Sequence, residues 1–218
     1  MKLRNYLVIS MGILMSTAVI GSQAVDAAEA SKGTSTAIFE LQSGDNSTVP
    51  ELIDPDIQPA TGNKGPLSLD AVSSFNFASK KLGTESKAPL EATPVAGKKL
   101  GLQVTDERGQ DLGWKLKVSA TTFETADKKL ALKGAVMTIP EGKLTTKAGV
   151  DPSLTPTAYK VDLSTTAATI MSASKTQGRS SWVNAFEGKA GKVTLTIPSG
   201  NKVASYSSTI TWSLEDAP

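Results

Sequence analysis

The sequence of 218 residues contains neither cysteine nor histidine. Disulfide bonds are therefore excluded, as are metal sites and catalytic groups built on thiolate or imidazole side chains. Lipid attachment to an N-terminal cysteine is excluded for the same reason. We expect no metal, no cofactor and no catalytic residue, and we expect a protein that is not an enzyme. A glycosidase with two carboxylates is the enzymatic alternative, but no pair of acids stands in a recognisable catalytic setting.

Aromatic residues are also scarce, at 5% of the chain. The length suits one domain or two small ones and allows a sizeable hydrophobic core. That core must consist mainly of valine, leucine, isoleucine and alanine. The formal net charge is only +2, and no nucleic-acid partner is expected.

Only one long apolar run is present, at residues 6–20, and it follows the basic residues Lys2 and Arg4. This arrangement is typical of a secretory signal peptide. The run is short for a membrane span, and no second run follows it. An uncleaved N-terminal anchor is the alternative, but we expect a secreted protein with no stable membrane anchor.

Two small-residue sites follow this run, Val25-Asp26-Ala27 and Ala28-Glu29-Ala30. Both resemble signal-peptidase sites. We therefore assign residues 1–30 to a signal peptide, with cleavage after Ala27 to Ala30, and residues 31–218 to the mature domain.

The last strand predicted by the pattern covers residues 205–214. Its apolar side chains, among them Trp212 and Leu214, alternate with serine and threonine. The same alternation occurs at residues 113–120, where Trp114 and Leu116 share one face. Successive side chains of a strand point to opposite faces, so both segments are predicted to be half-buried strands.

Further short alternating segments lie between glycine- and proline-rich turns, and no segment after residue 30 has a helical period. This pattern predicts an all-β fold, a single β-sandwich-like domain of many short, mostly antiparallel strands. Residues 43–65 are predicted to form a long irregular loop, and residues 79–99 to be exposed. Hairpin turns are predicted at 107–110 and 198–202. The other predicted strands cover residues 36–41, 67–72, 75–77, 102–105, 135–146, 158–163, 169–173 and 192–197.

Charge is unevenly distributed along the chain. Acids predominate from Ala37 to Asp70, and lysines from Lys80 to Lys133. The basic stretch either attracts a polyanion or solvates exposed strand faces and edges. Within the acidic stretch, Asp54 and Asp56 form a candidate carboxylate pair or calcium site, but no further ligands follow at EF-hand spacing.

The most specific feature is a Trp-x-Leu motif that occurs twice, as Trp114-Lys115-Leu116 and as Trp212-Ser213-Leu214 near the C-terminus. With the signal peptide, these motifs make the sequence resemble the WxL-domain cell-surface proteins of Gram-positive bacteria. The resemblance covers essentially the whole mature chain. Further matching segments are Pro50–Pro55, Thr61–Gly65, Leu67–Leu69 and Phe75–Phe77.

The resemblance implies non-covalent attachment to the cell wall through peptidoglycan, and membership of a complex with companion cell-surface proteins. It also implies that Trp114, Leu116, Trp212 and Leu214 bind the ligand. The expected location is the cell-wall surface, since the sequence shows no Leu-Pro-x-Thr-Gly sorting signal.

The strand pattern leaves the role of the two tryptophans open. Both lie on the apolar face of their strands, where a ring packs into the core, whereas a ring that stacks on a sugar must be accessible. Two motifs side by side at a partly exposed rim are an intermediate arrangement. Trp182 is an alternative candidate for an exposed aromatic residue.

Two functions are compatible with the resemblance. The first is a wall-binding module. The second is a structural or adhesive module that binds a partner protein or, through its lysines, an anionic wall polymer.

The mature protein is expected to begin between Ala28 and Ser31, because the two small-residue sites stand at the usual distance from the apolar run. N-terminal sequencing of protein recovered from culture or from the cell surface tests this. A chain that still starts at Met1 would contradict the assignment.

Overall fold

The computed structural model describes residues 31, 33–84, 88–187 and 191–216, and the chain divides into two units, Met1–Glu40 and Leu41–Pro218. The expected signal peptide, residues 1–30, lies outside the described residues. Residues 33–41 are exposed and form no regular secondary structure. The strand predicted at 36–41 is therefore wrong. An alternating pattern of side chains does not produce a strand when no other described segment pairs with those residues.

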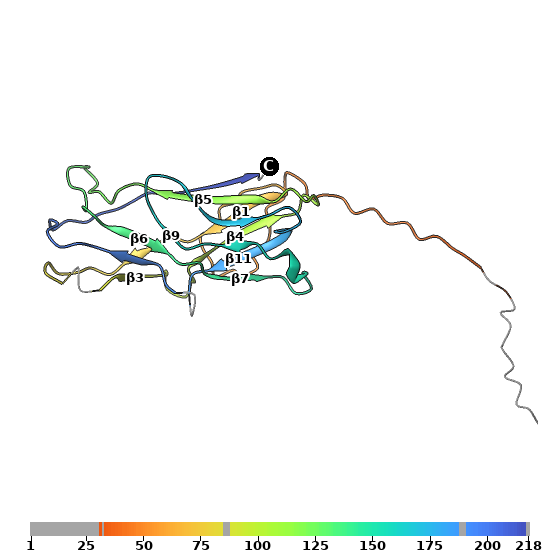
Figure 1. Cartoon of the computed structure of the whole chain (residues 1–218), viewed down its shortest axis with the longest axis horizontal. Coiled ribbons are helices and arrows are strands. Elements are labelled where there is room, and N and C mark those ends of the chain that lie inside the picture. The colour runs from red at the N-terminus through yellow and green to blue at the C-terminus, as the bar shows by residue number, and fades with distance from the viewer. Residues whose placement is uncertain (1–30, 32, 85–87, 188–190, 217–218) are drawn as a thin grey trace, which may run out of the picture. The chain divides into compact units, whose positions relative to one another are not determined.

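The second unit confirms the all-β prediction (Figure 1). No α-helix occurs in the described part, which has one 3₁₀ turn at Pro152–Leu154. Thirteen described strands pair antiparallel in three sheets. The first sheet has the order β1-β4-β11-β7, the second β13-β5-β10-β8 and the third β2-β3-β12-β6-β9.

The first sheet consists of β1 (Leu67–Val72), β4 (Gly101–Asp106), β11 (Ser180–Ala185) and β7 (Lys143–Thr146). The second consists of β13 (Ile210–Asp216), β5 (Trp114–Ala120), β10 (Ala168–Ala173) and β8 (Thr157–Ala158). The third consists of β2 (Asn76–Phe77), β3 (Leu90–Thr93), β12 (Thr194–Thr196), β6 (Val136–Ile139) and β9 (Val161–Asp162).

The main hydrophobic core contains side chains from all three sheets, and they come from strands in which buried and more exposed residues alternate. In β5 the residues of one parity are buried, while Lys115 is exposed and Lys117 is half-buried. Leu102 and Val104 of β4 reach the same core from the first sheet, and Leu195 reaches it from the third. As the composition predicted, most of the core is aliphatic, and each fully buried aliphatic side chain stabilises it by about 1.5–3 kcal/mol.

The long loop at 43–65 packs on the other face of the first sheet. Ile57 of the loop is 1% exposed and packs with Ala71, Val183 and Ala185 in a second, smaller hydrophobic cluster. No strand forms within these residues, where only isolated bridges occur. The loop thus shields a sheet face that otherwise lies in water.

A buried polar network lies under the same loop. Asp70 is 2% exposed, and its carboxylate accepts hydrogen bonds from the Ser68 hydroxyl, from Gln103 Nε2 at 2.8 Å and from Thr105 Oγ1 at 2.6 Å. Gln103 also connects to the loop, since its Oε1 accepts from the Ile53 amide at 2.7 Å. Burial raises the pKa of the Asp70 carboxyl, although the three hydrogen bonds favour the charged form.

Both predicted hairpins are wrong. Residues 107–110 connect β4 of the first sheet to β5 of the second, and residues 198–202 leave β12 of the third sheet, which pairs with β3 and β6. The glycine-containing segments at these two places do end a strand, as their residues indicated. A sandwich, however, uses many such turns to cross from one sheet to another.

Two other expectations change. Residues 79–99 are not wholly exposed, because β3 lies among them with Leu90 and Ala92 buried. Asp54 and Asp56 face lysines rather than forming a carboxylate pair for a metal: Lys99 Nζ lies 2.7 Å from Asp54 Oδ2 and 3.8 Å from Asp56 Oδ2. The hydrogen bond from Lys99 lowers the pKa of Asp54.

Asp70→Asn is expected to change the pH dependence of stability. The pKa of Asp70 is raised on folding from its ordinary value of 3.8. The native state therefore holds the proton more tightly, and this contributes stability that is fully present below the unfolded pKa and is lost as the pH rises through the folded pKa. Urea unfolding of the parent and D70N between pH 4 and 7 measures it.

The free energy of unfolding of the parent, relative to D70N, should rise as the pH falls through this range. All other titrating groups are common to the two chains. Parallel pH profiles would contradict the burial of an ionisable Asp70.

Candidate functional site

The two Trp-x-Leu motifs lie on neighbouring antiparallel strands, β5 and β13. In the register of β5 and β13, Leu116 faces Leu214, Val118 faces Trp212 and Trp114 faces Asp216. Residues directly opposite in an antiparallel pair share a face of the sheet. Both motifs therefore point to the same side, and the two rings flank a central pair of leucines.

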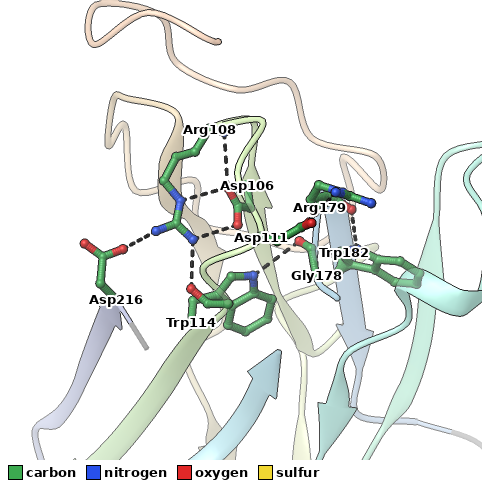
Figure 2. A network of polar contacts seen from close by, with 9 residues as sticks. Asp106, Arg108, Asp111, Trp114, Gly178, Arg179, Trp182 and Asp216 are labelled. Atoms are coloured by element: carbon green, nitrogen blue, oxygen red, sulfur yellow. Dashed lines mark hydrogen bonds and ion pairs between the residues drawn. The ribbon is translucent and has the colours of Figure 1, made fainter. Parts of the chain in front are cut away.

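The first motif is part of the core. Trp114 and Leu116 are both 0% exposed. The Trp114 indole Nε1 donates a hydrogen bond to the Gly178 carbonyl at 3.2 Å, which satisfies its one polar atom (Figure 2). Neither side chain therefore presents any surface to the solvent.

Two glycines near this ring leave no space for a larger residue. Gly178 has a φ of 75°, and a Cβ there would lie 2.5 Å from Trp114 Nε1. Gly113, just before the ring, has a φ of 74°, and its Cβ would lie 2.5 Å from the Ala173 carbonyl oxygen. Both positions therefore require glycine for conformation and for space.

An arginine joins the ends of the strands that carry the motifs (Figure 2). Arg108 donates from Nε and Nη2 to the two oxygens of Asp106 at 2.9 and 2.7 Å, and from Nη2 to the Gly113 carbonyl at 2.8 Å. Its third nitrogen pairs with Asp216, at the end of β13. One guanidinium thus fixes β4, the start of β5 and the end of the chain's last strand relative to one another.

Trp182 is not the exposed aromatic residue that the sequence offered as an alternative. It lies in β11, is 3% exposed, and donates from Nε1 to the Arg179 carbonyl at 2.9 Å (Figure 2). Its face is shared with Val104 across the β4–β11 pair, which belongs to the main core. Two buried indoles therefore bond to the consecutive carbonyls of Gly178 and Arg179.

The second motif lies at an edge. β13 is the outermost strand of its sheet, and β1 is the outermost strand of the first sheet. Trp212 and Leu214 are only partly buried, and they pack against the rim of the main core. Between them and β1 lies a groove of about 320 Å³, whose other lining residues are Asn63, Lys64, Leu67, Ser68 and Leu69.

A β-bulge in β1 positions the loop side of this groove. The register of β1 with β4 shifts between Leu69 and Ala71, which leaves carbonyls of β1 available. Thr61 donates from its amide to the Asp70 carbonyl at 2.8 Å, and Asn63 donates from Nδ2 to the Leu69 carbonyl at 2.9 Å. Exposed Lys64 is thereby held beside Trp212 and Leu214.

The sequence had singled out the two motifs as the expected ligand-binding residues. Of these, the structure leaves Trp212 and Leu214 accessible and brings them to Thr61–Gly65 and Leu67–Leu69, segments that had been noted only as part of the resemblance. Arg108 and Gly178 were missed as supporting residues. Gly113, directly before Trp114, was the one residue near the motif whose type indicated close packing around the strand.

A comparison against models of protein families identifies the family of the chain. The model of the WxL domain, described as surface cell wall-binding, matches residues 28–218. The chain belongs to this family. Its members are cell-wall-binding surface proteins rather than a family of enzymes, and the protein is accordingly a cell-wall-associated surface protein. Searches of curated proteins and of solved structures gave no match.

Two further observations concern the described residues alone. None of their helices is long and apolar enough to cross a membrane. They also contain no group of three or more aspartates and glutamates arranged to hold a metal ion.

The two tryptophans should differ in their contribution to stability. Trp114→Ala is expected to lower the free energy of unfolding by about 3–5 kcal/mol, because it empties a fully buried site. Trp212→Ala should cost clearly less, because part of its ring is already in contact with water. Urea unfolding of both variants and the parent, followed by circular dichroism, measures the difference.

Trp114→Phe serves if W114A does not fold. It keeps most of the apolar area but leaves the Gly178 carbonyl without its donor, at a cost of about 1–3 kcal/mol. Equal losses for W114A and W212A would contradict the different burial of the two motifs.

Proposed function

We propose that the protein binds peptidoglycan non-covalently at the groove between β13 and β1. The observation that carries this proposal is the partial exposure of Trp212 and Leu214 beside Lys64, while the first motif is fully buried. An aromatic ring offers an apolar surface to the C–H face of a sugar. The Lys64 ammonium suits the carboxylates of the stem peptides, and hydroxyl and amide groups at the rim suit sugar hydroxyls.

In this proposal the first motif has a supporting role. Trp114 and Leu116 hold β5 in the core, and β5 holds β13 through the opposed pair Leu116 and Leu214. Arg108 fixes the far end of β13 through Asp216. The strand that carries the accessible motif is thus held at both places, which reduces the conformational entropy that is lost when a ligand binds.

Sedimentation with purified sacculi, stripped of proteins and anionic polymers, tests the proposal. Trp212→Ala should weaken binding by about tenfold or more, equivalent to at least about 1.4 kcal/mol, and Lys64→Gln by a smaller factor. Binding of the parent should persist at about 0.5 M salt, because close contacts are screened less than exposed charges. Lys160→Gln, at an exposed site outside the groove, is the matched control for Lys64→Gln and should bind like the parent.

Two results would contradict this assignment. Undiminished binding by folded W212A would remove the groove from the site. Binding that requires the anionic polymers and is lost in salt would instead assign recognition to the lysines between Lys80 and Lys133.

The edge position of β13 favours a second function, as a subunit of a cell-surface complex. An outermost strand has a row of backbone groups that no neighbouring strand pairs on its outer side, and an extended segment of another protein can add there. Binding to protein-bearing wall fractions that is lost after protease treatment, together with no binding to purified sacculi, would favour a companion surface protein as the ligand.

A further inference from the structure

A second and larger cavity lies apart from the groove. It has a volume of about 460 Å³ and shares no lining residue with the groove. Its apolar floor includes Leu90, Met137 and Leu195 of the third sheet, together with Phe75, Phe77 and Phe123. This volume falls within the range of about 300–1,000 Å³ that is usual for pockets that bind small molecules.

Two loops form the walls, and each presents an exposed apolar side chain. Leu82 is 58% exposed on one wall, and Val203 is 80% exposed on the other. Large apolar side chains that lie together and remain in contact with water are typical of a surface that binds a ligand or a partner. Here they stand at a pocket whose floor is itself apolar, so a ligand with an apolar part is favoured.

The charge of the lining has one sign. Lys80, Lys81 and Lys202 contribute to the walls, and no aspartate or glutamate is among the lining residues that the structure describes. Some lysines elsewhere in the described part form ion pairs, as Lys192 does with Glu91 and Lys117 with Glu215. None of the three pocket lysines forms an ion pair with a described carboxylate.

We propose that this pocket binds a small amphipathic anion, an acyl or alkyl chain that carries one carboxylate or phosphate. The chain lies on the phenylalanines and the aliphatic floor, and the anionic group faces the three lysines. A neutral sugar does not use the lysines, and a polyanion without an apolar part does not use the floor. The proposal is independent of peptidoglycan binding, because it concerns different residues.

Titration of the full chain with octanoate and with octyl phosphate tests the proposal, with octanol and octyltrimethylammonium as uncharged and cationic counterparts. Binding is located by the ¹³C-methyl signals of two methionines. Met137 lines the pocket, whereas Met171 is fully buried in β10 and does not. Both anions should bind saturably and shift the Met137 signal but not the Met171 signal. Comparison of the two anions identifies which headgroup the pocket prefers.

Two variants test the three lysines and the exposed wall residue Leu82. Substitution of Lys80, Lys81 and Lys202 by glutamine should weaken anion binding by about tenfold and leave octanol unaffected. Leu82→Glu, which places a carboxylate on the wall at an exposed position, should weaken anion binding as well. Controls with the same change of charge are K115Q/K143Q/K160Q and Val95→Glu; all four positions are exposed and lie outside the pocket lining.

The absence of a saturable Met137 shift with either anion would overturn the proposal. So would equal affinity for the anionic, uncharged and cationic compounds, since the lysines would then have no role. Weakening by the control variants equal to that by the pocket variants would also overturn it, because general charge rather than this pocket would be responsible.

Discussion

The pairing of β5 with β13 is the interaction on which the rest of the site depends. Leu116 and Leu214 face each other across the two strands, and the strand that carries Leu116 is anchored by the buried Trp114 ring. Trp114 is fixed in turn by its hydrogen bond to Gly178, at a position where only glycine fits. Loss of this ring removes the support from the strand that carries the accessible motif, although the ring itself has no exposed surface.

The same three-residue motif has two roles because its copies occupy different places in one sheet. β5 is central, with β13 on one side and β10 on the other, so its inward side chains are covered completely. β13 is an edge strand, so side chains of the same parity remain partly accessible. Sequence pattern determines which face a side chain lies on, whereas strand order determines how deeply that face is buried.

This distinction explains what could be predicted from the sequence. The period of two around Trp114, Val193 and Trp212 was sufficient to predict an all-β fold and the faces of the strands. It gave no information on which strands pair, and so both hairpins were placed wrongly and Trp182 was offered as an exposed ring. The motifs were visible as residues of the site, but Lys64 and Leu69 join them only through contacts between segments about 150 residues apart in the sequence.

The loop at 43–65 connects the two faces of the first sheet. Its Ile57 is buried on the outer face, while Thr61 and Asn63 bond to carbonyls at the bulge of β1. Asp70 lies at that bulge, and its carboxylate accepts hydrogen bonds from Gln103 and Thr105. Because the same short stretch carries Leu67 and Leu69 on the inner face, the network under the loop also sets the shape of the groove. A substitution at Asp70 should therefore alter the groove without touching it, which makes the buried network a support of the proposed binding site as well as of the fold.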